Sequence, residues 1–211
     1  MSFNNKFHYL AIAGNIGAGK SSLTELLAAH FKWKPYFESV DNNPYLSDFY
    51  DDMVRWSFNL QVYFLSSRFR NQRNLLEMQG SFIQDRTIYE DVEIFAKNLF
   101  EMGLMSGRDY ENYRSLFQEM TSYLTPPDLL IYLKADVPTL VRQIQQRGRV
   151  YENSIRLDYL KKLNVLYEKW IQAYPYEKLI IETDDIDFVN DKEALGKIIG
   201  LIEKRRFSLF S

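Results

Sequence analysis

One short segment combines glycines, a lysine and a hydroxyl group at a spacing that suits phosphate chemistry. Residues 14–21, Gly-Asn-Ile-Gly-Ala-Gly-Lys-Ser, fit the pattern G-x-x-x-x-G-K-[ST]. In this pattern the backbone N–H groups of the loop point at phosphate oxygens, and the following helix adds the positive end of its dipole. Lys20 would bridge the β- and γ-phosphates of a nucleotide, and the Ser21 hydroxyl would ligate Mg²⁺.

The alternative for this segment is a glycine-rich turn that binds nothing. We favour the phosphate site because the segment follows an apolar run that predicts a buried strand and precedes an amphipathic stretch that predicts a helix. The residues expected around the phosphates are Gly14, Asn15, Ile16, Gly17, Ala18, Gly19, Lys20, Ser21 and Ser22.

Acidic residues stand at the ends of the next two predicted strands, Glu38 on one and Asp85, followed by Arg86, on the other. In an open α/β sheet, groups just beyond the carboxyl ends of the strands surround the ligand. A carboxylate there can take the proton of a hydroxyl acceptor, whereas it would repel an acceptor that is already a phosphate. Glu38 therefore favours a hydroxyl acceptor, with a solvated acid at a strand end as the alternative. The D-x-x-G and N-K-x-D patterns of switch GTPases do not occur in the sequence.

The composition narrows the chemistry further. The 26 basic and 28 acidic residues leave a net charge of −2, which does not favour nucleic acid or a membrane surface and leaves a small-molecule partner. Because the chain has no cysteine and two histidines, disulfides, zinc–thiolate sites and a cysteine nucleophile are excluded, and His8 and His30 are expected to be structural. No run of 18 apolar residues occurs, so we expect a cytoplasmic protein.

Strand-length apolar runs alternate with helix-like stretches, which predicts an α/β fold with a parallel sheet flanked by helices. The chain shows no internal boundary, so residues 1–211 are expected to form a single domain. The first and the last two strands should be buried on both faces, because they are almost continuously apolar. The five expected strands are Phe7–Ala13, Tyr36–Ser39, Ser81–Asp85, Leu129–Lys134 and Leu179–Glu182.

The helices expected between the strands include one long helix that carries polar residues on a single face. Gln61 and Arg68 are seven residues apart and leave the same side of it. A glutamine amide pairs with adenine N6 and N7, and Arg68 neutralised by Asp91 would still donate to a base edge. A buried ion pair beside a core amide is the alternative. The expected helices are Ser21–Phe31, Met53–Gln79, Glu90–Met102, Asp109–Tyr123, one from the Pro138 turn to Gln146, Leu157–Ala173 and Asp191–Arg206.

Together these motifs resemble the deoxynucleoside kinases of the deoxyadenosine, deoxyguanosine and deoxycytidine kinase group, over nearly the whole chain. The bacterial purine deoxynucleoside kinases are the most similar, because of Asp41-Asn42-Asn43-Pro44-Tyr45 and Asp85-Arg86-Thr87. The other segments that carry the resemblance are the loop at 14–21, Phe37-Glu38-Ser39-Val40, Arg55-Trp56-Ser57-Phe58-Asn59-Leu60-Gln61, Ile88-Tyr89-Glu90-Asp91, Pro127-Asp128-Leu129-Leu130-Ile131-Tyr132-Leu133 and Arg147-Gly148-Arg149.

The resemblance implies a P-loop kinase fold, a homodimer, and Mg²⁺-dependent transfer of the ATP γ-phosphoryl group to the 5′-hydroxyl of a deoxynucleoside. Glu38 matches the general base, and Arg86 matches the arginine that holds this carboxylate and the reacting oxygens. Lys20 completes the predicted catalytic set. Asp85 stands where the family usually has a glutamate that assists Mg²⁺, so a water molecule could bridge its shorter side chain to the metal.

The resemblance also assigns the residues that bind the acceptor. Tyr50 and Glu152 match the pair that grips the sugar 3′-hydroxyl, while Gln61, Arg68 and Asp91 match the set that contacts the base. Deoxyadenosine is the expected substrate and deoxyguanosine the next. A nucleoside monophosphate kinase and a non-catalytic nucleotide-binding module are the alternative functions.

Two arginines on a glycine-containing segment, which we call the lid, complete the predicted site. Arg147 and Arg149 are expected to clamp the transferring phosphoryl group, although cations at a helix end also complement the helix dipole. The family has an arginine one turn earlier, at the position of Gln143, whereas the basic residue in this chain is its neighbour Arg142. We therefore make no phosphate assignment for Arg142.

Overall fold

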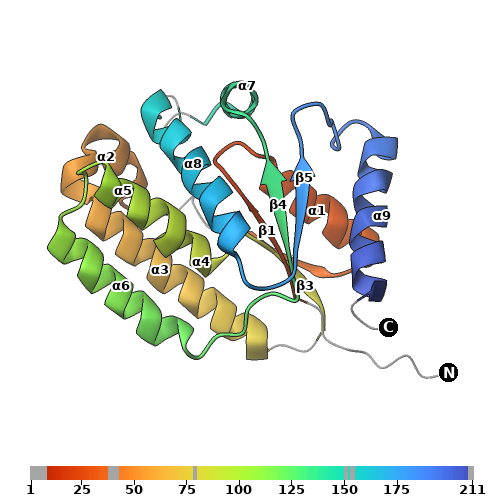
Figure 1. The fold of residues 1–211 in the computed structure, drawn as a ribbon, viewed down its shortest axis with the longest axis horizontal. Helices are drawn as coiled ribbons and strands as arrows, with labels where there is room; N and C mark the ends of the chain where they lie inside the picture. Colours follow the sequence, from red (N-terminus) through yellow and green to blue (C-terminus); the bar gives the residue numbers. More distant parts are fainter. Residues whose placement is uncertain (1–8, 38–42, 78–79, 150–151, 153–154, 209–211) are drawn as a thin grey trace.

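The computed structural model describes residues 9–37, 43–77, 80–149, 152 and 155–208. Within these residues, five parallel strands form one sheet in the order β2-β3-β1-β4-β5 (Figure 1). The strands are β1 (Tyr9–Gly14), β2 (Lys34–Tyr36), β3 (Phe82–Asp85), β4 (Leu129–Lys134) and β5 (Lys178–Glu182). The predicted α/β class with a parallel sheet is confirmed.

Strand β1 lies at the centre of the sheet, and all its residues are buried. Leu10 and Ile12 belong to one apolar core, and Ala11 and Ala13 belong to the core on the other face. This two-sided burial explains the almost continuous apolar sequence of β1. The phosphate loop follows β1 and therefore lies at the carboxyl ends of the strands, where ligands of open α/β folds bind.

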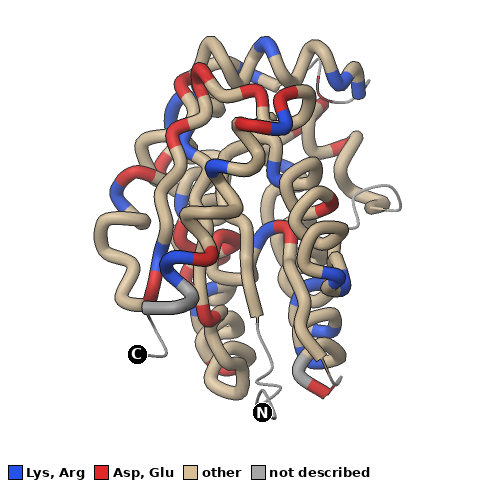
Figure 2. Tube along the Cα trace, turned by 90° about the vertical axis from the view of Figure 1, so that its right-hand side faces the viewer, with Lys and Arg blue, Asp and Glu red and all other residues tan. Residues whose placement is uncertain are grey.

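Helices cover both faces of the sheet. Figure 1 shows α1 and α9 on one side and α3, α6 and α8 on the other, which agrees with the composition of the two cores. Basic and acidic positions are interspersed along the chain in Figure 2. The helices are α1 (Lys20–Phe31), α2 (Leu46–Asp51), α3 (Met53–Glu77), α4 (Ile88–Glu90), the π-helix η1 (Asp91–Ala96), α5 (Lys97–Glu101), α6 (Gly107–Thr121), α7 (Val137–Arg147), α8 (Leu157–Ala173) and α9 (Lys192–Ser208).

The two strands at the edges of the sheet differ from the sequence expectation. Strand β2 begins before the expected Tyr36 and pairs with β3 through Lys34, Pro35 and Tyr36. Pro35 is tolerated because an edge strand needs hydrogen bonds on one side alone. The expectation that β5 is buried on both faces is wrong: Ile180 is 46% exposed while Leu179 and Ile181 are buried, because α9 covers one face of this edge strand.

The helical segments contain two features that the sequence analysis did not predict. Helix α2 is too short for its apolar spacing to be recognised, although its Leu46 and Phe49 are buried. The helix expected over Glu90–Met102 instead runs through α4, η1 and α5 from Ile88 to Glu101, with a π-helical turn in its middle. None of the helices in the described part of the chain is both long and apolar enough to cross a membrane.

Candidate active site

The phosphate loop joins the end of β1 to the start of α1, as the sequence predicts. Gly17 and Gly19 adopt φ values of 85° and 86°, a region that favours glycine. A Cβ atom at Gly17 would lie 2.8 Å from the carbonyl oxygen of Leu140, and one at Gly19 would lie 2.9 Å from Cζ of Phe188. The loop is therefore packed against α7 on one side and against the segment that precedes α9 on the other.

Lys20 and Asn15 hold the interior of the loop together. The Lys20 side chain is buried, and its Nζ donates to the backbone carbonyl of Asn15 at 2.9 Å. The Asn15 amide donates in turn to the carbonyl of Leu160 at 3.2 Å and to Oδ1 of Asn164 at 3.0 Å, both on α8. These contacts place the lysine charge within the turn of the loop, where phosphates of a bound nucleotide would meet it.

Ser21 and Asp85 form the candidate magnesium site. The Ser21 hydroxyl donates to Oδ2 of Asp85 at 2.5 Å, while the buried Oδ1 of Asp85 has no hydrogen-bond partner among the described residues. An unpartnered carboxylate oxygen beside a hydroxyl suits Mg²⁺, which prefers oxygen ligands and usually completes its shell with phosphates and water. Ser21 and Asp85 therefore fit a magnesium site that the protein supplies in part.

Arg86 follows directly after β3 and points into the same region. Its φ of 66° lies in the left-handed range, and its backbone N–H donates to the carbonyl of Ile12 at 2.9 Å. The guanidinium carbon lies 4.4 Å from the ring centroid of Phe95, and Nη1 donates to Oη of Tyr167 at 3.3 Å. Arg86 is 4% exposed, so its charged guanidinium is buried.

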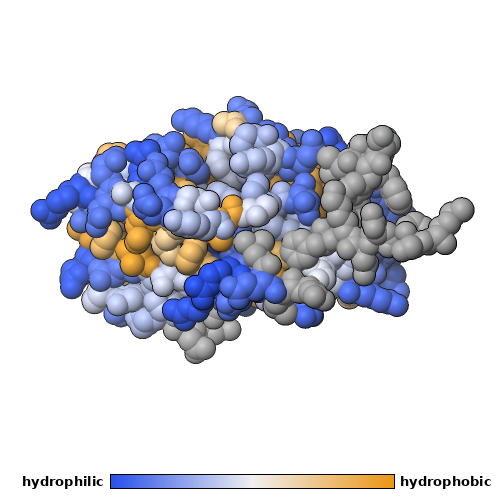
Figure 3. All heavy atoms as spheres, turned by 90° about the horizontal axis from the view of Figure 1, so that it is seen from below, coloured by the Kyte–Doolittle hydropathy of each residue, from blue (hydrophilic) through white to orange (hydrophobic). Residues whose placement is uncertain are grey.

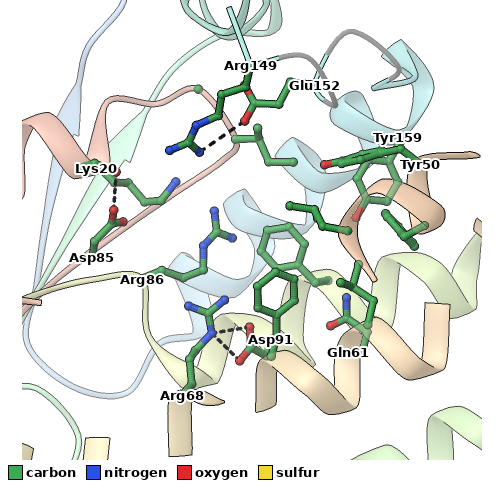
Figure 4. A pocket seen from close by; sticks show the side chains of 18 of the residues that line it. Lys20, Tyr50, Gln61, Arg68, Asp85, Arg86, Asp91, Arg149, Glu152 and Tyr159 are labelled. Carbon is green, nitrogen blue, oxygen red and sulfur yellow. Dashed lines mark hydrogen bonds and ion pairs between the residues drawn. The ribbon is translucent and has the colours of Figure 1, made fainter. Parts of the chain in front are cut away.

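One cavity brings most of the predicted site residues together (Figure 4). It extends from the phosphate loop to the polar face of α3, so a single ligand in it would contact both ends. The predicted residues that line it are Ile16, Gly17, Lys20, Ser21, Tyr50, Gln61, Arg68, Asp85, Arg86, Asp91, Arg147, Arg149 and Glu152. We call this space the acceptor cavity.

Gln61, Arg68 and Asp91 form its far wall, as the helical spacing predicts. Nε of Arg68 donates to both carboxylate oxygens of Asp91, at 2.8 and 2.7 Å, and both residues are buried. Oε1 of Gln61 is buried and has no hydrogen-bond partner in the described part of the chain. Because a buried polar atom without a partner costs stability, this amide oxygen is suited to a ligand that donates to it.

Glu152 lies at the opposite end of the cavity and joins the lid arginines. It accepts hydrogen bonds from Nε and Nη2 of Arg147, and Nη1 of Arg149 lies 3.7 Å from its Oε1. The carboxylate is almost completely buried, whereas both arginines are about one-third exposed. Glu152, which is expected to bind the sugar, is therefore in direct contact with the arginines expected to bind phosphate.

A second cavity lies on the other side of the phosphate loop and is lined by Ser22, Arg142 and Gln143 together with residues 183–190. Nη2 of Arg142 donates to Oγ1 of Thr139 at 3.3 Å, within α7. Within this segment Asp187 accepts hydrogen bonds from the side-chain amide and the backbone N–H of Asn190, and these bonds hold the pKa of Asp187 below its ordinary value. We call this space the donor cavity.

Some site residues were missed or cannot be placed. Glu38 and His8 lie outside the described residues. The sequence indicated one apolar wall residue of the acceptor cavity, Phe64, which lies one helical turn from Gln61; the other apolar walls were missed, among them Phe49, Phe95 and Tyr159. Phe95 had one signal, since it lies four residues after Asp91. The other two carry no motif, because their place in the cavity depends on how α2 and α8 pack.

Comparison with known proteins assigns the family. The model of the family described as deoxynucleoside kinase matches residues 10–205. The chain is 44% identical to a deoxyadenosine/deoxycytidine kinase from Bacillus subtilis over 92% of this chain and 90% of the relative. It is 37% identical to a deoxyadenosine kinase from Dictyostelium discoideum, over 94% and 81% of the two chains. The solved structure of a deoxyadenosine kinase from M. mycoides with bound dATP superimposes with a TM-score of 0.83, at 26% identity over 93% of this chain and 99% of that one.

Proposed function

The chain belongs to the deoxynucleoside kinase family, and on that premise we propose that it transfers the γ-phosphoryl group of ATP to the 5′-hydroxyl of a purine deoxynucleoside. The observation that carries this proposal is the acceptor cavity, which is lined at one end by Lys20, Ser21 and Arg86 and at the other by Gln61 and Arg68. A phosphate-binding end and a base-binding end in one cavity bring a nucleoside into line with the terminal phosphate of a nucleotide.

The catalytic residues act through charge and position. Lys20 and Arg86 stabilise the charge that develops on the transferring phosphoryl group, because both cations are buried at the phosphate end of the cavity. Ser21 and Asp85 would hold Mg²⁺, which neutralises phosphate charge when bound. Glu38 is the proposed general base that takes the 5′-hydroxyl proton; this role rests on its position after β2 and on the family resemblance.

The residues of the far wall of the acceptor cavity determine which base the enzyme would prefer. The Oε1 atom of Gln61 is a buried acceptor without a partner among the described residues, and the adenine N6 amino group is a donor. Arg68, held by Asp91, presents a guanidinium toward the same space. We propose deoxyadenosine as the best substrate and deoxyguanosine as the next, in agreement with relatives named deoxyadenosine kinase and deoxyguanosine kinase.

A substrate panel tests the proposed function. Initial rates with ATP and Mg²⁺ should be measured for the four deoxynucleosides, for adenosine and for dAMP and dTMP as acceptors. We expect the highest kcat/KM with deoxyadenosine. Preferred phosphorylation of dAMP or dTMP would favour the monophosphate kinase alternative, and ATP binding without turnover on any deoxynucleoside would favour the non-catalytic module.

We also propose a homodimer formed through the helices α3 and α6. Figure 3 shows hydrophobic side chains gathered among hydrophilic ones at the end of the molecule where Figure 1 places these helices. On α6, Leu116 is 42% exposed, and on α3, Phe58, Val62 and Phe69 are partly buried. Light scattering should give twice the mass of the chain, and Leu116→Lys should shift the protein toward the monomer. The cytoplasmic location and the single domain stay predictions from the sequence.

A further inference from the structure

Two residues outside the predicted catalytic motifs, Phe95 and Tyr167, hold the side chain of Arg86. Its guanidinium rests against the face of Phe95, and Nη1 donates to Oη of Tyr167 at 3.3 Å. Tyr167 belongs to α8 and is completely buried, at a sequence distance of 81 residues from Arg86. A ring face and a hydroxyl oxygen thus contribute to where this long, flexible side chain points.

The Tyr167 hydroxyl is itself held in one orientation. Its proton is donated to Oε1 of Glu90 at 2.8 Å. A hydroxyl has one proton, so its lone pairs remain for Arg86. Burial raises the pKa of Tyr167 well above its ordinary value, with Arg86 opposing and Glu90 reinforcing the rise. The phenol therefore stays protonated near neutral pH and continues to donate to Glu90.

Glu90 connects this hydroxyl to the phosphate loop. Its side chain is fully buried, and Oε2 accepts from the backbone N–H of Thr87 at 2.7 Å and from the Thr87 hydroxyl at 3.1 Å. Oε1 also accepts from the backbone N–H of Gly14, the first residue of the loop, at 3.4 Å. One carboxylate thus links β1, the start of α4 and, through Tyr167, the guanidinium of Arg86.

We propose that Tyr167 and Glu90 are positioning residues for phosphoryl transfer, because they keep the guanidinium of Arg86 in register with the phosphate loop. This inference rests on the proposed function, in which Arg86 stabilises the reacting oxygens. Charge stabilisation by a preorganised donor depends steeply on its placement, so a guanidinium free to change rotamer lowers the rate without weakening substrate binding. Apolar side chains would fill the same space with less desolvation, so the polar pair is not explained by packing alone.

Tyr132 provides a matched control. Its ring stacks on that of Tyr167 with centroids 5.8 Å apart and an interplanar angle of 18°. It is buried as well, and its hydroxyl donates to a carboxylate, Oε1 of Glu168, at 3.1 Å. Tyr132→Phe therefore removes a hydroxyl group from the same pair of stacked rings, as Tyr167→Phe does, but it leaves the hydrogen bond between Arg86 and Tyr167 in place.

The experiment compares Tyr167→Phe with Tyr132→Phe in steady-state kinetics and thermal unfolding. We expect Tyr167→Phe to lower kcat by about ten-fold, as for loss of a hydrogen bond to a charged group, with both KM values within about two-fold of wild type. Tyr132→Phe should keep kcat within about two-fold. It loses one part-buried hydrogen bond, whereas Tyr167→Phe loses two buried ones, so Tyr167→Phe should unfold at the lower temperature of the two. Equal kcat values for the two variants would overturn the proposal.

A double-mutant cycle separates positioning from general damage. In an Arg86→Gln background, Tyr167→Phe should cost less than about two-fold, because the group that it positions is absent. A further ten-fold loss in that background would show that the tyrosine acts independently of Arg86. Glu90→Gln should lower kcat in the same way and should not add to Tyr167→Phe. Failure of the proposed function would appear separately, as a wild-type enzyme that phosphorylates no deoxynucleoside.

Discussion

Arg147 holds the Glu152 carboxylate at two points, with Nε 3.0 Å from Oε2 and Nη2 2.5 Å from Oε1. Both oxygens of Glu152 are engaged in this arrangement, and Arg149 lies close to one of them. Because a carboxylate has about four lone-pair sites, Glu152 can accept from the sugar 3′-hydroxyl while it holds Arg147. The lid is therefore coupled to the acceptor cavity through one carboxylate.

This contact predicts how the enzyme distinguishes sugars. The wild type should prefer 2′-deoxyadenosine over 2′,3′-dideoxyadenosine by about ten-fold in kcat/KM, since a hydrogen bond to a charged group is lost with the dideoxy sugar. In Glu152→Gln most of this preference should disappear. Glu168→Gln, in which the altered carboxylate faces Tyr132 instead, is the control and should keep the preference. An unchanged preference in Glu152→Gln would contradict the assignment.

The proposed general base gives the second prediction. Glu38→Gln keeps the shape of the side chain but removes its capacity to take a proton. We expect kcat to fall by roughly 100-fold or more with little change in nucleoside affinity, measured by steady-state kinetics and by calorimetric titration. A kcat within a few-fold of wild type would exclude Glu38 as the base.

The third prediction concerns Mg²⁺. Chelation with EDTA should abolish turnover, and Asp85→Asn should raise the Mg²⁺ concentration for half-maximal rate by about ten-fold or more, because the amide oxygen carries no charge. Asp109→Asn, in the first turn of α6 and outside the lining of both cavities, is the control and should keep the Mg²⁺ dependence of the wild type. The measurement is the rate as a function of Mg²⁺ at constant free ATP. If Asp85→Asn behaves like the control, Asp85 does not assist the metal.

The buried pair of Arg68 and Asp91 predicts a stability effect. Asp91→Ala leaves the guanidinium buried without its main partner, so the free energy of unfolding should fall by about 3–5 kcal/mol. The double variant Asp91→Ala/Arg68→Met should recover part of this loss, since the buried charge is removed. Asp158→Ala breaks an ion pair of two exposed side chains and should stay close to wild type. Urea denaturation measures all three, and equal stability of Asp91→Ala and the wild type would contradict the prediction.

The start of α7 predicts a pH dependence. The Asp136 side chain accepts from the backbone N–H of Thr139 at 2.7 Å, and this bond holds the pKa of Asp136 below its ordinary value of 3.8. A carboxyl whose pKa is lowered by folding stabilises the protein above its unfolded-state pKa, and the stabilisation is lost as the pH falls through the lower, folded value. Thermal unfolding from pH 5 downward should therefore depend less on pH in Asp136→Asn than in the wild type. Parallel curves would contradict this role.

The central part of the fold follows closely from local sequence. Strand β4 and helix α8 have the predicted bounds, because the apolar run of β4 is buried on both faces and α8 carries one continuous apolar stripe. The edges of the sheet were less predictable. Strand β2 contains a lysine and a proline and is a strand because β3 lies beside it. The π-helical turn of η1 has no sequence signature, yet two of its residues, Asp91 and Phe95, line the acceptor cavity.

The sequence by itself determined the phosphate loop and the parallel sheet, because each depends on spacing within one strand, helix or turn. The polar residues that line the acceptor cavity were expected from the resemblance to the family and, for Gln61 and Arg68, from their spacing on one helix. Only the tertiary structure decided how those residues are held. Glu90 and Tyr167 are 77 positions apart and meet because α8 packs against η1, the helical segment that begins directly after Glu90. Such contacts depend on the packing of distant elements, and the order of residues along the chain does not encode them locally.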